Sequence, residues 1–304
     1  MGSGSGSSRP WGMKQGFAVC GGLFLIGVVL QVLVGEVQWG ALRWPVNVFV
    51  LVAGLAVIGV IYGLRRRVRF FEWMMHNGAG VPALVFALAL TLVMGLVTQG
   101  DSGLPWLGRM LRFWPFVLAW GWMLLIAGLV ALNHLLRWKL REVPFVLNHL
   151  GLFVAVVAAA LGAPDKQDLR LMAFSETPEW RAVDDSGALV ELDFAVTLHR
   201  FIMETYDDGS PRRFASEVTV ASREGDAGTE GIVEVNKPLK FGGWKIYQYD
   251  YDAAAGAESA YSTFELVRDP WLWAVYAGIF MMLAGAVCLM LFMAPKPVKE
   301  EERV

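Results

Sequence analysis

The chain has 304 residues, of which 56% are hydrophobic, and its mean hydropathy is +0.47. So apolar a composition excludes an ordinary soluble protein, because the remaining polar residues could not cover the apolar surface. The 26 basic and 28 acidic residues give a net charge of −2, so the chain lacks the positive excess of nucleic-acid-binding proteins.

Six apolar runs have about the length that a helix needs to cross a bilayer. They are expected at Gly16–Gly35, Val46–Leu64, Val81–Val97, Trp114–Leu136, Val143–Leu161 and Trp271–Met293. The first run has no small-residue cleavage site after it, so we interpret it as a retained helix behind a flexible leader. The sequence therefore predicts a polytopic α-helical membrane protein.

The basic residues predict the orientation of this protein, because Lys and Arg near span ends stay on the cytoplasmic side. One face of the predicted bundle carries twelve of them: Arg9, Lys14, Arg65, Arg66, Arg67, Arg69, Arg137, Lys139, Arg141, Lys296, Lys299 and Arg303. The short loops on the other face carry Arg43, Arg109 and Arg112. We therefore expect the protein to lie in the inner (cytoplasmic) membrane of its cell, with both termini in the cytoplasm.

The long polar segment before the last run is then extracytoplasmic, and its pattern is typical of β structure. Stretches such as "ELDFAVTLHRF" and "FASEVTVAS" alternate apolar and polar residues, and turn residues separate them. We expect six or seven short strands in an antiparallel sandwich or barrel. The segment holds 21 acidic and 11 basic residues, a surplus that solvates a small domain or steers a basic partner.

These patterns predict five parts. They are a cytoplasmic leader at 1–15, a five-helix membrane domain at 16–162, an extracytoplasmic β domain at 163–270, a last membrane helix at 271–293 and a cytoplasmic tail at 294–304. The two cysteines, Cys20 and Cys288, lie in predicted spans and form no CxxC motif, so thiol redox chemistry is not expected.

Two of the four histidines lie near the cytoplasmic ends of neighbouring spans. His134 is within a turn of the predicted inner boundary, and His149 lies roughly 9 Å into the next helix at 1.5 Å per residue. Polar groups at such depth are costly and tend to be functional, and neutral imidazole is a common axial ligand of haem iron. His134 has a simpler interpretation at the headgroups, where it complements the helix dipole. His76 is expected at the membrane interface, and His199 in the β domain is expected to be a surface or structural residue.

An aromatic strand follows the turn "NKPLKFGG" in the β segment. It carries Trp244, Tyr247, Tyr249 and Tyr251, and strict alternation places the three tyrosines on one face and Trp244 on the other. Such a face is usually part of a core. An exposed one would instead contact an extended polypeptide or a flat ring.

These residues resemble a known family. Asn236–Leu239, Gly243 and "IYQYDYD" are similar to the "N-x-P-L … G-(aromatic)-x-x-Y-Q" signature of the ResB family of cytochrome c biogenesis proteins. "FVLNHLGLFVAVVAAALG" and "VRDPWLWAVYAGIFMMLAGAVCL" resemble the helices on either side of that family's outer domain. The chain departs from the family by having five predicted helices before a small outer domain, where familiar members have three before a larger one. It also lacks the tryptophan-rich WWD motif of the CcsA-type partner.

The resemblance implies a cytochrome c maturation factor that takes part in haem transfer with a CcsA-type membrane protein. In that role His149 would be an axial ligand of transiently bound haem b, with His134 a possible second ligand. Trp244, Tyr247, Tyr249 and Tyr251 would contact apocytochrome c or the partner. The chain would be one component of a haem lyase, since it shows no nucleophile–base pair, P-loop or dinucleotide motif of its own. Two alternatives stay open, which are a b-type haem electron-transfer subunit and a haem-free membrane scaffold that binds protein.

Overall fold

The structure is a computed structural model that describes residues 11–100, 105–137, 142–225 and 228–292. The chain forms two compact units, one of Met1–Pro164 with Trp271–Val304 and the other of Asp165–Pro270. The predicted tail at 294–304, Lys139 and Arg141, and most of the predicted leader lie outside the described residues.

Six helices are long and apolar enough to cross a membrane, as the sequence predicted. They are α1 (Met13–Val34), α2 (Val46–Leu64), α4 (Asn77–Leu96), α5 (Trp114–Leu136), α6 (Val143–Gly162) and α7 (Leu272–Phe292). A short helix, α3 (Arg69–Trp73), precedes α4. The chain is a multi-pass membrane protein, and its β domain is inserted between α6 and α7.

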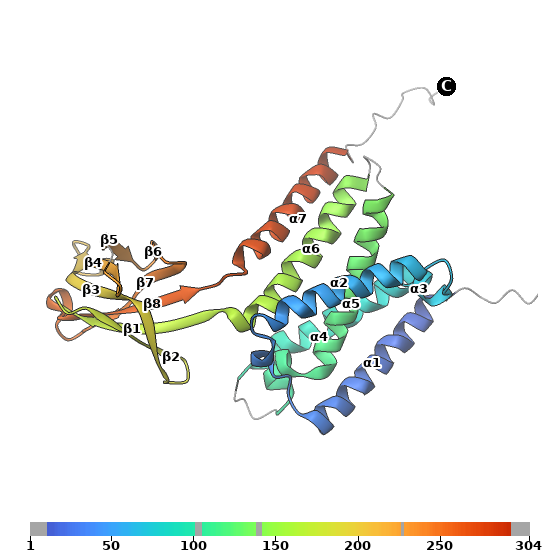
Figure 1. The fold of residues 1–304 in the computed structure, drawn as a ribbon, viewed down its shortest axis with the longest axis horizontal. Coiled ribbons are helices and arrows are strands. Elements are labelled where there is room, and N and C mark those ends of the chain that lie inside the picture. The colour runs from blue at the N-terminus through green and yellow to red at the C-terminus, as the bar shows by residue number, and fades with distance from the viewer. Residues whose placement is uncertain (1–10, 101–104, 138–141, 226–227, 293–304) are drawn as a thin grey trace, which may run out of the picture. The chain divides into compact units, whose positions relative to one another are not determined.

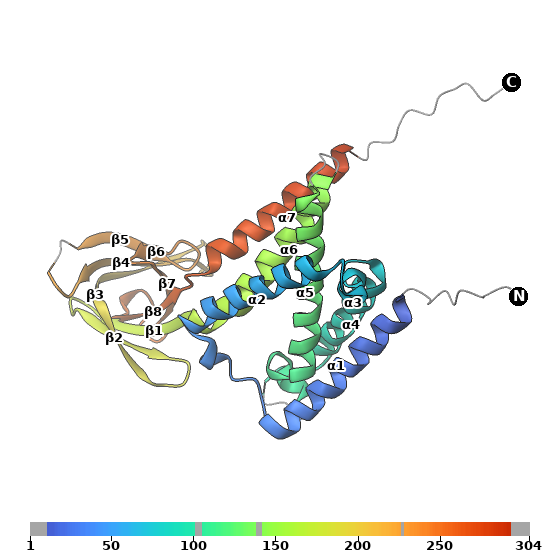
Figure 2. The same ribbon diagram turned by 45° about the vertical axis from the view of Figure 1, so that its right-hand side comes forward.

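Helix α5 is the centre of the membrane unit. Half of its 18-residue apolar stretch is buried inside the protein, whereas 11% of the corresponding stretch is buried in α2 and in α7. Helices α1 and α4 pack against α5 and against each other (Figure 2). Glycines permit these contacts, because a Cβ at Gly27 would lie 2.6 Å from the Cα of Pro115 at the start of α5. Close packing of small residues is what holds helices together where lipid removes the hydrophobic driving force.

Helices α6 and α7 lie side by side along their length (Figure 1). A Cβ at Gly151 would lie 2.7 Å from the carbonyl oxygen of Gly278, and a Cβ at Gly278 would lie 2.6 Å from the carbonyl oxygen of Gly151. At neither position is there room for a larger side chain. One face of α6 therefore packs against α7, and a ligand of α6 has to bind on another face.

The outer unit is a single antiparallel sheet of eight strands, in the order β5-β4-β3-β2-β1-β8-β7-β6. The strands are β1 (Gln167–Phe174), β2 (Glu179–Asp184), β3 (Leu189–Thr205), β4 (Pro211–Ser222), β5 (Thr229–Glu234), β6 (Leu239–Phe241), β7 (Trp244–Tyr251) and β8 (Tyr261–Arg268). The β fold is as predicted, whereas the prediction of six or seven strands is wrong. The sequence reading missed β1 and β2, which directly follow the helical segment.

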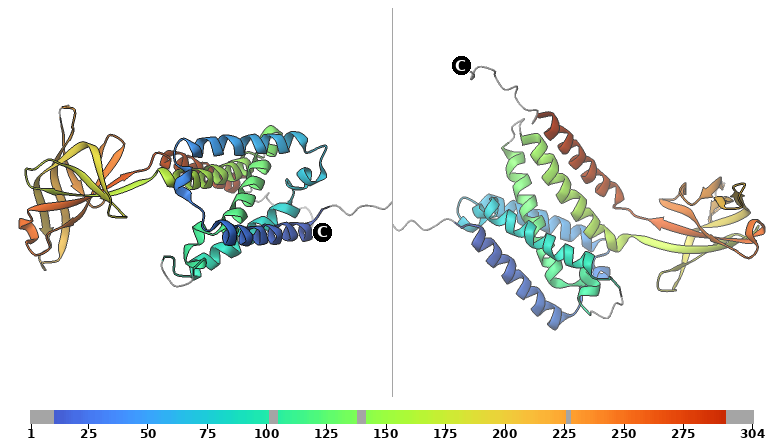
Figure 3. Two further views of the ribbon diagram at one scale, coloured as in Figure 1. Left: turned by 60° about the horizontal axis from the view of Figure 1, so that its bottom comes forward. Right: turned by 180° about the vertical axis from the view of Figure 1, so that it is seen from behind.

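The sheet curls until its two ends meet around one core (Figure 3). Ser216 of β4 donates a hydrogen bond to the side-chain oxygen of Gln248 of β7 at 2.6 Å, and it lies 2.8 Å from the hydroxyl of Ser262 of β8. All three side chains are buried, and their mutual bonds satisfy polar groups that would otherwise be costly inside a core. At the rim, Gly231 of β5 lies against Leu239 of β6.

An ion-pair cluster on the domain surface predicts a pH-dependent stability. Arg213 lies 2.8 Å from Glu204 and 2.7 Å from Glu234, and its hydrogen bond is the main reason that the pKa of Glu234 is held below its usual value of 4.5. A lowered carboxyl pKa stabilises the fold above the unfolded-state pKa, and this contribution is lost as the pH falls through the folded-state pKa.

Replacing Arg213 with glutamine should therefore destabilise the domain near neutral pH and do so progressively less below about pH 4.5. The measurement is the urea concentration at which residues 165–270 of the detergent-solubilised chain unfold, followed by hydrogen exchange and mass spectrometry at each pH of that range. Arg212→Gln is the control, because the Arg212 guanidinium lies over the ring of Tyr206, 5.8 Å from its centroid. A penalty for Arg213→Gln that does not change with pH would contradict the account.

Candidate functional site

His149 is held in one tautomer on the second turn of α6. Its Nδ1 lies 2.9 Å from the backbone carbonyl oxygen of Phe145, one turn earlier in the helix. A carbonyl oxygen only accepts, so Nδ1 carries the proton and Nε2 of the neutral ring keeps its lone pair. The side chain is half-buried. This is the arrangement in which an imidazole is oriented by one nitrogen and binds a metal through the other.

His134, near the end of α5, contacts the side chain of the same phenylalanine. The ring of Phe145 is 4.3 Å from the His134 ring and 3.9 Å from the His149 ring, centroid to centroid, and is nearly parallel to the latter. Nδ1 of His134 lies 3.0 Å from a carboxylate oxygen of Glu142, the residue before α6. The structure thus brings the two histidines to one place, which the sequence did not settle, and adds Phe145 and Glu142, which it did not single out.

The remaining polar and small residues of this turn face α7. The side-chain amide of Asn148 donates to the carbonyl oxygen of Pro144 at 2.8 Å within α6. Asn148 also packs against Gly285 of α7, and Gly151 packs against Gly278 and Met282. The space beside Gly151 is therefore filled by α7 and leaves no room there for a ligand of His149.

In the outer domain, a β-bulge changes which aromatic residues of β7 are exposed. Pairing with β8 passes from Gln248 opposite Phe264 to Asp250 opposite Thr263, so Tyr249 is the extra residue. Beyond the bulge the alternation reverses, and the Tyr251 ring stacks on Phe201 at 4.7 Å. The prediction that Tyr251 shares the face of Tyr247 and Tyr249 is wrong for this reason.

Of the four predicted contact residues of β7, three keep some accessible surface, and Tyr251 is half-buried like Tyr247. Trp244 is 5% exposed and packs in the core against Phe194, so it offers no surface to a partner. Tyr247 is half-buried, while Tyr249 is 49% exposed with the guanidinium of Arg170 lying 4.6 Å from its ring centroid. Tyr249 is therefore the aromatic residue of this strand that best fits a contact surface.

Most residues of the signature on which the family resemblance rests have a structural role in the outer domain. Gly242 and Gly243 both have positive φ values, 54° and 84°, and form the tight turn between β6 and β7 that other residues adopt poorly. Leu239 packs on the core, and Gln248 is part of the buried bond to Ser216. The motif identifies a hairpin more directly than it identifies a binding site.

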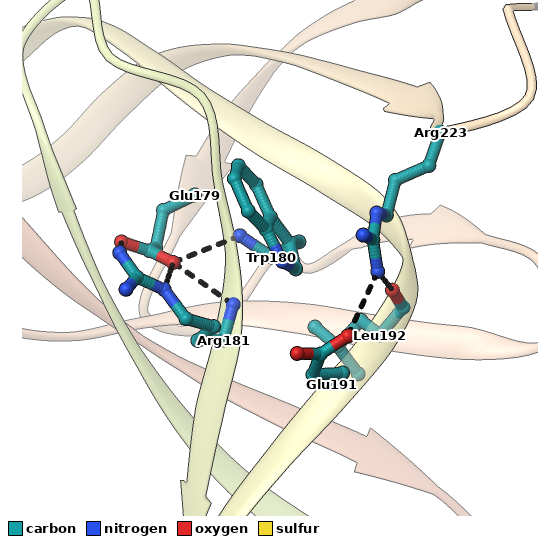
Figure 4. A network of polar contacts seen from close by, with 6 residues as sticks. All are labelled: Glu179, Trp180, Arg181, Glu191, Leu192 and Arg223. Carbon is teal, nitrogen blue, oxygen red and sulfur yellow. Dashed lines mark hydrogen bonds and ion pairs between the residues drawn. The ribbon is translucent and has the colours of Figure 1, made fainter.

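A second aromatic group, around the half-buried Trp180 of β2, was not anticipated. Trp180 lies between the guanidinium groups of Arg181 and Arg223, which are 5.5 and 5.0 Å from its ring centroid (Figure 4). Each arginine is itself paired, Arg181 with Glu179 at 2.8 Å and Arg223 with Glu191 at 3.3 Å. Those carboxylates neutralise the arginines, and the hydrogen bond from Arg181 is the main reason that the pKa of Glu179 is lowered.

His199 belongs to a chain of three side chains on the domain surface. It is the extra residue of a bulge in β3, its Nδ1 lies 3.2 Å from the carboxylate of Glu176, and its Nε2 lies 2.8 Å from the hydroxyl of Thr219. Both ring nitrogens are thus occupied within the domain. Among the described residues, no group of three or more His, Cys, Asp or Glu side chains could hold a metal ion.

Known proteins resemble part of this chain. Residues 137–260 match the ResB-like family. The chain is 32% identical over 117 residues to the cytochrome c biogenesis protein CcsB of Synechococcus elongatus, a match that covers 36% of this chain and 25% of the relative. It is 27% identical over 130 residues to CcsB of Thermosynechococcus vestitus, covering 42% of this chain and 28% of that protein. A third relative, the cytochrome c biogenesis protein Ccs1 of Porphyra purpurea, is 36% identical over 63 residues, covering 21% of this chain and 14% of the relative.

The match spans only about a quarter of the length of the first of these relatives. Among solved structures, a chain named Cytochrome c Heme Lyase CcmF aligns with a TM-score of 0.35 and 18% identity, over 76% of this chain and 42% of that one. That likeness is too low to carry an argument. The segment that matches the family model includes His149 and all of β7. The resemblance predicted from the sequence is thus confirmed for residues 137–260, which match the ResB-like family.

Proposed function

We propose that this protein is a cytochrome c maturation factor that binds haem b transiently in its membrane unit and presents apocytochrome c with its outer domain. The observation that carries the proposal is the 2.9 Å distance from Nδ1 of His149 to the carbonyl oxygen of Phe145, which assigns the proton of the neutral ring to Nδ1 and the lone pair to Nε2. This residue lies within the ResB-like segment. Haem is the cargo in this function, and His149 would hold its iron during transfer.

The proposed direction of transfer is supported by the charges at the span ends. With the basic residues on the cytoplasmic side, the end of α5 and the start of α6 would be cytoplasmic, and His149 would receive haem in the inner leaflet. The β domain would then be extracytoplasmic, where covalent attachment of haem to a cytochrome takes place. A CcsA-type membrane protein would complete the haem path and carry the lyase chemistry, as the family resemblance implies.

Removal of the protein from its cell tests this function. We expect covalently bound c-type cytochromes to be lost, as seen by haem staining after denaturing electrophoresis, while b-type haem enzymes keep their activity. Loss of quinone-linked electron transfer with intact c-type cytochromes would favour the electron-transfer alternative. If neither changes, the scaffold alternative is favoured.

The surface position of Tyr249 predicts a specific effect on the client. Replacing Tyr249 with alanine should lower photo-crosslinking of the full-length protein to a peptide of apocytochrome c that contains its CxxCH segment, by about threefold to tenfold. The physical reason is the loss of one exposed aromatic anchor, which is worth about 1 kcal/mol or more at an interface.

The matched control for this experiment is Tyr206→Ala. Tyr206 is also an exposed tyrosine, 58% accessible, and it lies in the turn between β3 and β4 rather than on β7. Equal crosslinking by wild type and the Tyr249 variant would remove Tyr249 from the client surface. An equal loss in both variants would show a nonspecific effect of exposed tyrosines.

A further inference from the structure

A cavity of about 600 Å³ lies at the end of the membrane unit where the chain passes from α4 to α5. It is lined by Met94, Gln99, Gly108, Arg109, Leu111 and Arg112. Met94 belongs to the last turn of α4, and the others belong to the connection that follows, which contains the 3-10 helix η2 (Leu107–Arg112). The cavity therefore lies at the level where membrane spans end, which is the depth of lipid headgroups.

Hydrogen bonds hold the wall of this cavity in place. The side-chain nitrogen of Gln99 lies 3.1 Å from the carbonyl oxygen of Met94 and 3.0 Å from that of Leu107, so one amide joins α4 to η2. The backbone N–H of Val37, in the connection between α1 and α2, donates to the carbonyl oxygen of Arg112 at 3.0 Å. A wall built in this way needs little rearrangement to receive a ligand, which lowers the cost of binding.

The charged groups at the cavity favour an anion. Arg109 and Arg112 both face the carboxylate of Glu36, at 3.4 and 3.7 Å, and the arginine side chains are about half exposed. Two guanidinium groups and one carboxylate leave one positive charge here. Arginine binds phosphate oxygens through two parallel N–H···O bonds, so a phosphate group with one negative charge fits this site in both shape and charge.

The surroundings of the two arginines are apolar. Leu111, which lines the cavity, is 61% exposed, and the nearby chain also exposes Leu96 at the end of α4 and Trp106 before η2. Exposed tryptophan is typical of the boundary between lipid and water, and exposed leucine at a span end is stable in contact with acyl chains. A ligand of this cavity therefore has an apolar part beside its phosphate.

We infer that this cavity binds one monoanionic phospholipid, with its phosphate diester on Arg109 and Arg112 and its acyl chains along Met94 and Leu111. The lipid would bridge the end of α4 and the connection between α1 and α2. The cavity lies outside residues 137–260, and its ligand is not haem, so the inference goes beyond the proposed function and can fail without it.

Native mass spectrometry of the full-length protein in detergent tests this site, with phosphatidylglycerol as the anionic lipid and phosphatidylcholine of the same acyl chains as the zwitterionic reference. Wild type should bind phosphatidylglycerol more tightly. Arg112→Gln should lower that affinity about fivefold, the usual effect of one cation at a membrane surface. Arg43→Gln is the matched control and should keep the wild-type affinity. Arg43 is an exposed arginine between α1 and α2, and it donates to the carbonyl oxygen of Pro164 at 3.1 Å.

A second variant has the opposite expected effect, so a loss of folding cannot imitate it. Glu36→Gln removes the negative charge from the cavity at nearly constant side-chain size, and it should tighten phosphatidylglycerol binding about fivefold. Equal affinities for the two lipids in wild type, equal effects of Arg112→Gln and Arg43→Gln, or no tightening in Glu36→Gln would overturn the inference. Displacement of the lipid by inorganic phosphate would show a site for free phosphate and would also overturn it. Haem binding at His149 is unaffected by any of these results.

Discussion

Replacing His149 with alanine is expected to lower the cellular content of covalent c-type cytochromes by at least about tenfold, with the protein still inserted in the membrane. Loss of a metal ligand should cost no less than the 10- to 100-fold typical of its hydrogen-bonded outer partners. The imidazole is half-buried and, among the described residues, is hydrogen-bonded to its own helix, so its removal leaves the α6–α7 contact at Gly151 and Gly278 intact. The measurement is haem staining of membranes, normalised to the amount of the variant protein.

His76→Ala is the control for this variant. His76 precedes α4 and makes no side-chain capping bond there, so its replacement should leave c-type cytochromes at the wild-type level. Unchanged cytochromes in the His149 variant would remove that residue from haem transfer. Equal losses in both variants would show that any membrane histidine is needed for stability.

Replacing Trp244 with alanine should destabilise the outer domain by about 3–5 kcal/mol, the usual cost of truncating a buried aromatic residue. The ring is 5% exposed and lies 6.3 Å from that of Phe194, centroid to centroid, inside the core that unites the curled sheet. The expected result is rapid digestion of residues 165–270 by thermolysin at temperatures at which wild type resists. Tyr249→Ala, on the same strand, should change the stability by no more than about 0.5 kcal/mol, as is usual for an exposed site.

The contrast between these two variants also separates core from contact surface. If Tyr249→Ala unfolds the domain as readily as Trp244→Ala, the Tyr249 ring belongs to the core and its loss of crosslinking has no bearing on client binding. If the domain still resists thermolysin after Trp244→Ala, the Trp244 ring does not contribute to the stability of the core.

The membrane helices were predictable because a bilayer demands long apolar runs, and few other structures produce them. The ends of α2 and α5 coincide with the predicted Val46–Leu64 and Trp114–Leu136. The start of α4 was missed by four residues, since Asn77 opens the helix before the apolar run begins. Local composition marks where a helix enters the apolar phase, and the hydrogen bonds of the first turn lie outside that signal.

The prediction of which face each β7 side chain occupies is wrong beyond Gln248. Strict alternation of side chains between the two faces requires that every residue of β7 pairs with one residue of the neighbouring strand. The bulge at Tyr249 depends on the pairing with β8, a strand that follows ten residues later, and neither sequence stretch marks it alone. The same holds for His199, which a bulge between β3 and β4 leaves exposed beside Glu176.

The sequence predicted part of the histidine site. His149 was singled out as a candidate site residue because it is polar and lies in an apolar run, and counting residues along the helices gave His134 a similar depth. The contact of the Phe145 ring with both imidazole rings depends on how α5 and α6 are rotated about their axes, which helix packing decides. Glu142 reaches His134 for the same reason.

The most direct test of the account is the visible spectrum of the detergent-purified chain, oxidised and reduced, beside that of the His149→Ala variant. The account predicts a b-type spectrum in the wild-type protein, alone or when purified with a CcsA-type partner, and its loss in the variant. A wild-type protein without haem under both conditions, or a b-type spectrum that is the same in the His149→Ala variant, would contradict it.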